Sequence, residues 1–184
     1  METKYTESRL VRLIGVIGLA ISLGIECLRE AHAADVYVDK GACPFECCTY
    51  RAWRVVKPFR LYDAIGSGTA IEKVAAGGKI QALTGEVHSV PYRTQAISDV
   101  PVQKIRKGDE VFFLVSLGEG FWKVRHQGRI IELDDAESVT DFAERTKKVP
   151  IQSQWWIRLR SPSGKTGWTK EDDQFFGPDM DSCS

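Results

Sequence analysis

The chain has 184 residues, of which 25 are Lys or Arg and 25 are Asp or Glu, so its formal net charge is zero. This balance gives no electrostatic bias towards nucleic acid or an anionic membrane surface, and no nucleic-acid partner is expected. The 43% of apolar residues exclude an intrinsically disordered chain and predict a folded globular protein.

The first 33 residues have the pattern of a secretory signal peptide. A basic start precedes an apolar run over residues 13–25, and Ala31-His32-Ala33 offers a cleavage site with small residues. The run is shorter than the roughly 20 residues that a membrane-spanning helix needs. We therefore expect cleavage near Ala33 and a secreted or periplasmic mature protein that meets a membrane only during export.

Four cysteines lie beyond this segment: Cys43, Cys47 and Cys48 in a cysteine-rich segment, and Cys183 near the end. An even number in an oxidising compartment favours disulfides, and four cysteines allow three connectivities. A bond between the adjacent Cys47 and Cys48 would close a strained ring. We therefore expect Cys183 to pair with Cys47 or Cys48, and Cys43 with the other. Either pairing predicts that the two ends of the mature chain lie together.

Most of the remaining chain has the two-residue alternation or the apolar runs of β-strands. Strand-like segments separated by glycine turns cover residues 35–38, 53–56, 58–63, 70–83 and 105–133. By contrast, residues 92–102 show no periodicity and are predicted to be a loop, and residues 137–148 a short helix or a loop. Residues 170–176 suggest one helical turn that leads into a last strand.

The stretch from Trp155 to Thr169 predicts a β-hairpin. Trp155, Ile157 and Leu159 alternate with polar or amphipathic neighbours, as on a strand with one buried face. Ser161-Pro162-Ser163-Gly164 is a cluster of turn-forming residues. Gly167 then permits a close backbone approach, and Trp168 returns a large ring to the fold.

This hairpin resembles the closing hairpin of bacterial SH3-like (SH3b) domains. The apolar strand over residues 58–63 and the strand–turn–strand over residues 70–83 resemble the same family. Residues 105–133 are loosely similar, since Phe121-Trp122-Lys123-Val124-Arg125 repeats the pattern of the closing hairpin. The resemblance implies an all-β protein built on a small β-barrel, with a binding role that often involves cell-wall peptide or an envelope protein.

Two arrangements fit this repetition. A single SH3-like barrel over residues 53–172 can carry a β-rich insertion at about residues 92–150, or two SH3-like units can interleave. Two clean tandem domains are disfavoured, because only about 50 residues follow Leu133 and the first half of them is not strand-like. In the single-barrel reading, the signal peptide is 1–33, the cysteine-rich segment is 34–52, and the C-terminal tail tied by Cys183 is 173–184.

Aromatic residues are the best candidates for binding, because SH3-like barrels hold extended peptides against rings in a groove. Trp155 and Trp156 must face opposite sides of their strand, so one of them lies outside the core. The candidates for exposed rings are Trp156, Trp122, Tyr62 and Trp168.

No convincing catalytic site is present, so we expect a non-enzymatic protein without cofactor or metal. The alternative is a thiol-dependent cell-wall hydrolase or redox protein that uses Cys47 or Cys48 with His88. Zinc binding by the same cysteines is less expected than their oxidation in an exported protein. His126 lies beside the Gln127–Gly128 turn, so it is expected to be solvent-exposed, and it has no obvious carboxylate partner.

Overall fold

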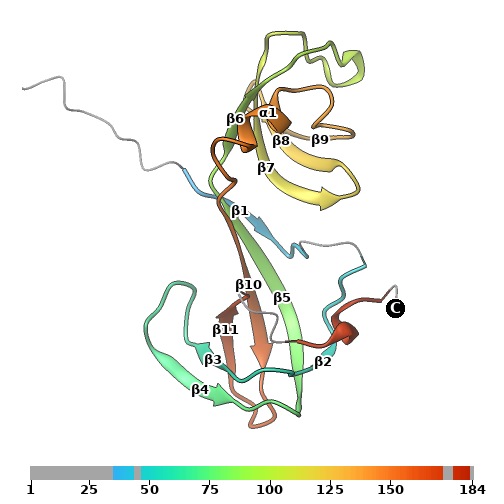
Figure 1. Ribbon diagram of the computed structural model, residues 1–184. Coiled ribbons are helices and arrows are strands. Elements are labelled where there is room, and N and C mark those ends of the chain that lie inside the picture. Colours follow the sequence, from blue (N-terminus) through green and yellow to red (C-terminus); the bar gives the residue numbers. More distant parts are fainter. Residues whose placement is uncertain (1–34, 44–46, 172–175, 183–184) are drawn as a thin grey trace, which may run out of the picture. The chain divides into compact units, whose positions relative to one another are not determined.

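The predicted closing hairpin forms and joins the larger of two antiparallel sheets (Figure 1). The structure is a computed structural model that describes residues 35–43, 47–171 and 176–182. In it, β10 (Ser153–Arg160) pairs with β11 (Thr166–Lys170), with Arg158 opposite Trp168. The turn between them is closed by the Gly164 N–H, which donates to the Ser161 carbonyl, and Gly164 has the positive φ of +86° that favours glycine.

The larger sheet has seven strands in the order β1-β5-β10-β11-β3-β4, with β2 also paired to β5. Both β1 and β2 lie along the same edge of the long strand β5, one at each end of it. The strands besides the hairpin are β1 (Tyr37–Lys40), β2 (Ala52–Arg54), β3 (Phe59–Tyr62), β4 (Ala70–Val74) and β5 (Lys79–Ser89). The strand pairings of the described residues do not close this sheet into a barrel, so the fold observed is two antiparallel sheets.

The smaller sheet has the order β6-β7-β8-β9 and comes entirely from the segment between β5 and β10, which are neighbours in the larger sheet. Its strands are β6 (Tyr92–Gln95), β7 (Glu110–Gly118), β8 (Phe121–His126) and β9 (Arg129–Leu133). The helix α1 (Phe142–Thr146) follows, and two short 3-10 turns span Pro101–Gln103 and Pro178–Met180. No helix in the described ranges is long and apolar enough to cross a membrane.

The prediction of a loop over residues 92–102 is wrong at its start, where β6 forms. Tyr92 lies opposite Phe113 and Thr94 lies opposite Val111 on β7. The Thr94 side chain is fully buried, and its hydroxyl donates to the Val111 carbonyl at 2.8 Å. A strand of four residues is too short to show a clear period, and its partner lies about 17 residues away along the chain.

The described residues bury two clusters of apolar side chains, one on each sheet, and Leu114 and Val115 of β7 belong to the cluster of the larger sheet. The cluster of the larger sheet includes Trp53, Leu61, Ile80, Ile157 and Leu159, all 1% exposed or less. The cluster of the smaller sheet is formed mainly by Val111, Phe113, Trp122, Val124, Leu133 and Phe142. The expected alternation on β10 is confirmed, since Trp155, Ile157 and Leu159 are buried while Trp156 is half-buried and Arg158 and Arg160 are exposed.

A disulfide joins Cys43 to Cys48, which is one of the pairings that the sequence leaves open. Cys47 is also disulfide-bonded. Cys183, the predicted signal peptide and residues 172–175 of the helical turn predicted over 170–176 lie outside the described residues, and Lys170 at the start of that turn ends strand β11 instead. The backbone N–H of Ser182 donates to the Cys47 carbonyl at 2.8 Å, and that of Thr49 donates to the Met180 carbonyl at 3.0 Å. The tail therefore lies against the cysteine segment, as a bond to Cys183 requires.

Gly167 fills a position where a side chain has no room, as the sequence predicts. A Cβ built there would lie 2.6 Å from the backbone oxygen of Tyr62 and 2.8 Å from Ile71 Cδ1. Gly167→Ala is expected to lower the free energy of unfolding by about 1–3 kcal/mol, because β11 must move away from β3. The measurement is a urea titration under non-reducing conditions. Gly78→Ala, where nothing lies within 4 Å of the added Cβ, is the matched control and should unfold at the wild-type midpoint. Equal midpoints for both variants would contradict the close approach.

Candidate functional site

Three neighbouring strands of the larger sheet present aromatic and basic side chains on the face away from its core. On β10 the outward residues are Trp156, Arg158 and Arg160, because their neighbours in sequence are buried. Arg158 lies opposite Trp168 on β11, and Trp168 lies opposite Tyr62 on β3. These rings therefore share one face of the sheet.

A groove of about 440 Å³ runs beside this face. Its walls come from β3, from the loop that follows β3, and from the β10–β11 hairpin. The loop is held by the Ser67 N–H, which donates to the Ala64 carbonyl, and Gly66 adopts a positive φ of +73° there. The lining residues are Pro58, Phe59, Arg60, Tyr62, Gly66, Ser67, Gly68, Trp156, Thr169 and Lys170.

Two of the four predicted binding rings, Tyr62 and Trp156, line this groove, and both are half-buried. Trp168 is also half-buried and occupies the same sheet face between them, but it does not line the groove. An amphipathic ring that is partly exposed in a concave site offers a stacking surface to a ligand.

The prediction that Trp122 is an exposed ring is wrong. Its side chain is only 9% exposed, and the ring packs against Phe113 and Phe142 at centroid distances of 5.1 Å each. Its Nε1–H donates to the Glu137 carboxylate at 3.3 Å. Phe142 belongs to α1, a segment whose sparse apolar positions did not indicate that it covers the sheet.

His88 lies on β5 next to the groove face, and the described cysteines offer it no thiol to activate. Its Nε2 is 3.0 Å from the Glu86 carboxylate, and its ring is 6.5 Å from that of Trp156 between centroids. Cys48 is bonded to Cys43, and Cys47 is oxidised as well. A disulfide sulfur is not a nucleophilic thiolate, so nothing here favours the thiol enzyme considered from the sequence.

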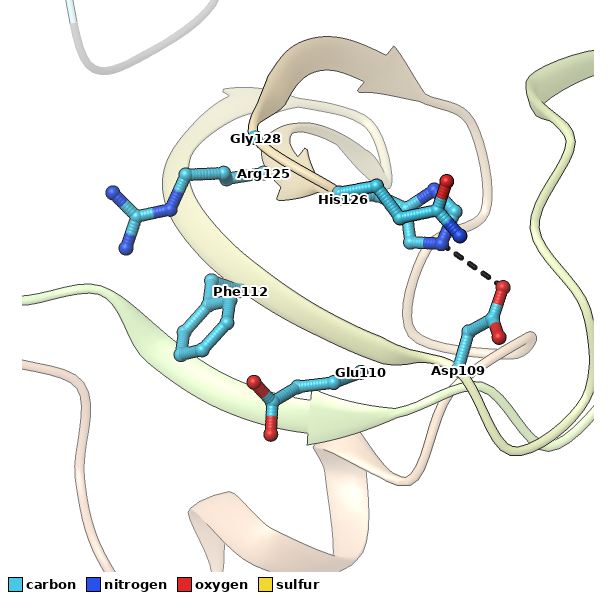
Figure 2. A pocket seen from close by; sticks show the side chains of 7 residues that line it. Asp109, Glu110, Phe112, Arg125, His126 and Gly128 are labelled. Atoms are coloured by element: carbon cyan, nitrogen blue, oxygen red, sulfur yellow. Dashed lines mark hydrogen bonds and ion pairs between the residues drawn. The ribbon is translucent and has the colours of Figure 1, made fainter.

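A second hollow lies at the end of the smaller sheet, where His126 meets Asp109 (Figure 2). It measures about 360 Å³ and is lined by Asp109, Glu110, Phe112, Arg125, His126, Gln127 and Gly128. The predictions that His126 is exposed and lacks a carboxylate partner are both wrong. Its side chain is 1% exposed, and its Nε2 lies 2.9 Å from Asp109 Oδ2.

The Asp109 carboxylate holds two parts of the smaller sheet together. Its Oδ2 accepts from the Arg106 backbone N–H at 2.9 Å as well as from His126. The Arg106 hydrogen bond, and then the hydrogen bond and charge of His126, lower the pKa of Asp109 below its ordinary value despite some desolvation. Because a carboxylate only accepts, His126 carries its hydrogen on Nε2.

This pair has the geometry of a catalytic base and its orienting carboxylate, but not the surroundings. Among the described residues that line the hollow, none carries a hydroxyl or a thiol. His126 Nδ1 is buried and, within the described ranges, has no hydrogen-bond partner. An imidazole that is 1% exposed reaches no substrate, so we interpret the pair as a structural contact.

Metal binding finds no support in the part of the chain that the structure describes, since no group of three or more His, Cys, Asp or Glu side chains gathers there.

Comparisons with known proteins give no further guidance: no family model matches the chain, and neither curated proteins nor solved structures include a significant match.

Proposed function

We propose that this protein is a non-catalytic binding module of the bacterial cell envelope with an SH3-like core, and that its groove holds an extended peptide segment. The observation that carries the proposal is the groove in which Tyr62 and Trp156 lie half-buried. Extended peptides bind in shallow grooves whose aromatic rings pack between successive side chains.

Support for the SH3-like core comes from the two stretches that resemble that family best. Residues 53–90 supply β2, β3, β4 and β5, and residues 151–170 supply β10 and β11. These six strands are neighbours in one sheet although about 60 residues separate the two stretches in sequence. The resemblance also suggests that the ligand is a peptide of the cell wall.

The test is co-sedimentation with purified peptidoglycan, before and after an amidase removes its peptides. The full exported protein is expected to sediment with intact peptidoglycan and to stay in solution with the stripped material. Trp156→Ala should lose sedimentation, because it removes one wall of the groove.

Phe121→Ala is the matched control for Trp156→Ala. Phe121 is an aromatic residue 41% exposed on β8 of the smaller sheet, outside the groove, so its loss should leave sedimentation unchanged. Sedimentation with the stripped material would show that the ligand is glycan and would overturn the proposal. Absence of the wild-type protein from every pellet would exclude a cell-wall peptide as the ligand.

A further inference from the structure

Among the described residues, the lining of the groove between β3 and the β10–β11 hairpin carries positive charge only, since it includes Arg60 and Lys170 and no carboxylate. Arg60 and Tyr62 point to the same face of β3, because the intervening Leu61 is fully buried. Lys170 lies opposite Trp156 in the hairpin register. Each cation is thus close to one of the two rings.

The acidic residue that lies opposite one of these rings in the strand register already contacts another side chain. Glu86 lies opposite Trp156 on β5, and its carboxylate is 3.0 Å from His88 Nε2. In the described ranges, Arg60 makes no side-chain hydrogen bond or ion pair, so its guanidinium is available to a ligand.

We infer that the groove selects peptides that carry a carboxylate, which Arg60 binds while Tyr62 and Trp156 pack against the neighbouring peptide. A guanidinium binds a carboxylate through two parallel N–H···O bonds, and such charge-assisted bonds are about twice as strong as neutral ones. This inference rests on the proposed function, since it names the class of ligand for the same groove.

A carboxylate can come from an acidic side chain or from a peptide C-terminus, and three short peptides separate these sources. Ac-Ala-Glu-Ala-NH2 carries only a side-chain carboxylate, Ac-Ala-Gln-Ala-OH carries only a terminal one, and Ac-Ala-Gln-Ala-NH2 carries none. Binding is followed by the indole N–H signal of Trp156 in NMR titrations of the full mature protein, with Trp156→Phe used to assign that signal.

We expect at least one of the two carboxylate peptides to bind about tenfold more tightly than the amide peptide. Arg60→Gln should remove this preference and Arg60→Lys should restore part of it, whereas Arg160→Gln should leave it intact. Arg160 is the matched control because it is an exposed arginine on the same sheet face that does not line the groove. Raising the salt concentration from about 50 to about 300 mM should reduce the difference in affinity between the carboxylate peptides and the amide peptide.

The outcomes separate the inference from the proposed function. If all three peptides bind alike, or if Arg60→Gln and Arg160→Gln behave alike, the carboxylate inference is overturned and peptide binding stands. If no peptide shifts the Trp156 signal while peptidoglycan still binds through Trp156, the inference is again overturned. If neither peptides nor peptidoglycan bind, the proposed function fails as well.

Discussion

Replacing Trp53 by alanine is expected to lower the free energy of unfolding by about 3–5 kcal/mol. The Trp53 side chain is fully buried in the core of the larger sheet. Its ring lies 5.1 Å from Phe176, 5.8 Å from Tyr50 and 6.1 Å from Trp155 between centroids. Truncation leaves a cavity among three aromatic rings that rigid neighbouring strands cannot close.

The loss of Trp53 also removes a hydrogen bond. The indole Nε1–H donates to the Thr49 carbonyl, within the cysteine-rich segment, at 2.8 Å. Trp53→Phe keeps most of the ring but not this donor, so we expect an intermediate loss of about 1–2 kcal/mol. Comparing Trp53→Ala with Trp53→Phe therefore separates the stability that comes from packing of the ring from the stability that comes from its hydrogen bond.

Urea unfolding under non-reducing conditions, followed by circular dichroism, measures these losses. The control is Trp156→Ala, which truncates a tryptophan that is half-buried on the outer face, and it should lower the free energy of unfolding by about 1 kcal/mol or less. Equal losses for Trp53→Ala and Trp156→Ala would contradict the assignment of these rings to the core and the groove. The control has a second use, because a folded Trp156→Ala is required for the peptidoglycan experiment.

The faces of individual strands could be predicted from the sequence because alternation is a local property. Trp155 and Trp156 are adjacent on one strand, so if one of the two rings faces the core, the other must face outwards. Gly167 could be assigned to a close approach for a similar reason, since it lies between two strand residues. These predictions need no knowledge of which strands pair.

The groove and the burial of Trp122 depend on pairings between distant segments, which a single sequence does not specify. The groove brings the loop after Tyr62 against Trp156, about 90 positions later. Trp122 is covered by Phe142 from α1, so its exposure could not be judged from its own strand. The smaller sheet begins with a strand of four residues, too short for its period to be recognised.

His126 is the one error that the sequence itself could have corrected. On β8, Trp122, Val124 and His126 are all buried, and they follow one another at the two-residue period of a strand. The adjacent Gln127–Gly128 turn suggested exposure and outweighed this alternation. The carboxylate partner, by contrast, comes from Asp109, which is 17 residues earlier and lies directly before β7.

Replacing His126 by alanine is expected to lower the free energy of unfolding by about 2–4 kcal/mol. The imidazole is 1% exposed, so its removal leaves a cavity and also removes the contact with Asp109. His88→Ala is the matched control, since His88 also pairs with a carboxylate at 3.0 Å but is 23% exposed. That variant should lose about 1 kcal/mol or less. If the two histidine variants unfold at the same urea concentration, the structural role of His126 is refuted.

The Asp109→Asn variant tests whether the charge of Asp109 stabilises the fold. A contribution from this charge makes the stability difference between wild type and variant depend on pH, whereas a contribution from the packing of His126 alone does not. The pKa of Asp109 is lowered in the folded protein, so its carboxylate adds stability that is fully present above the unfolded pKa of about 4. That stability is lost as the pH falls through the lower folded pKa, because both states are then protonated. The wild type should therefore unfold at a higher urea concentration than Asp109→Asn near neutral pH, and the two unfolding midpoints should converge in strong acid.

Asp99→Asn is the control, because Asp99 also accepts a hydrogen bond from a backbone N–H, that of Lys107, but does not contact His126. A constant gap between wild type and Asp109→Asn at all pH values would mean that the charge of Asp109 does not stabilise the fold, and that His126 is held by packing alone.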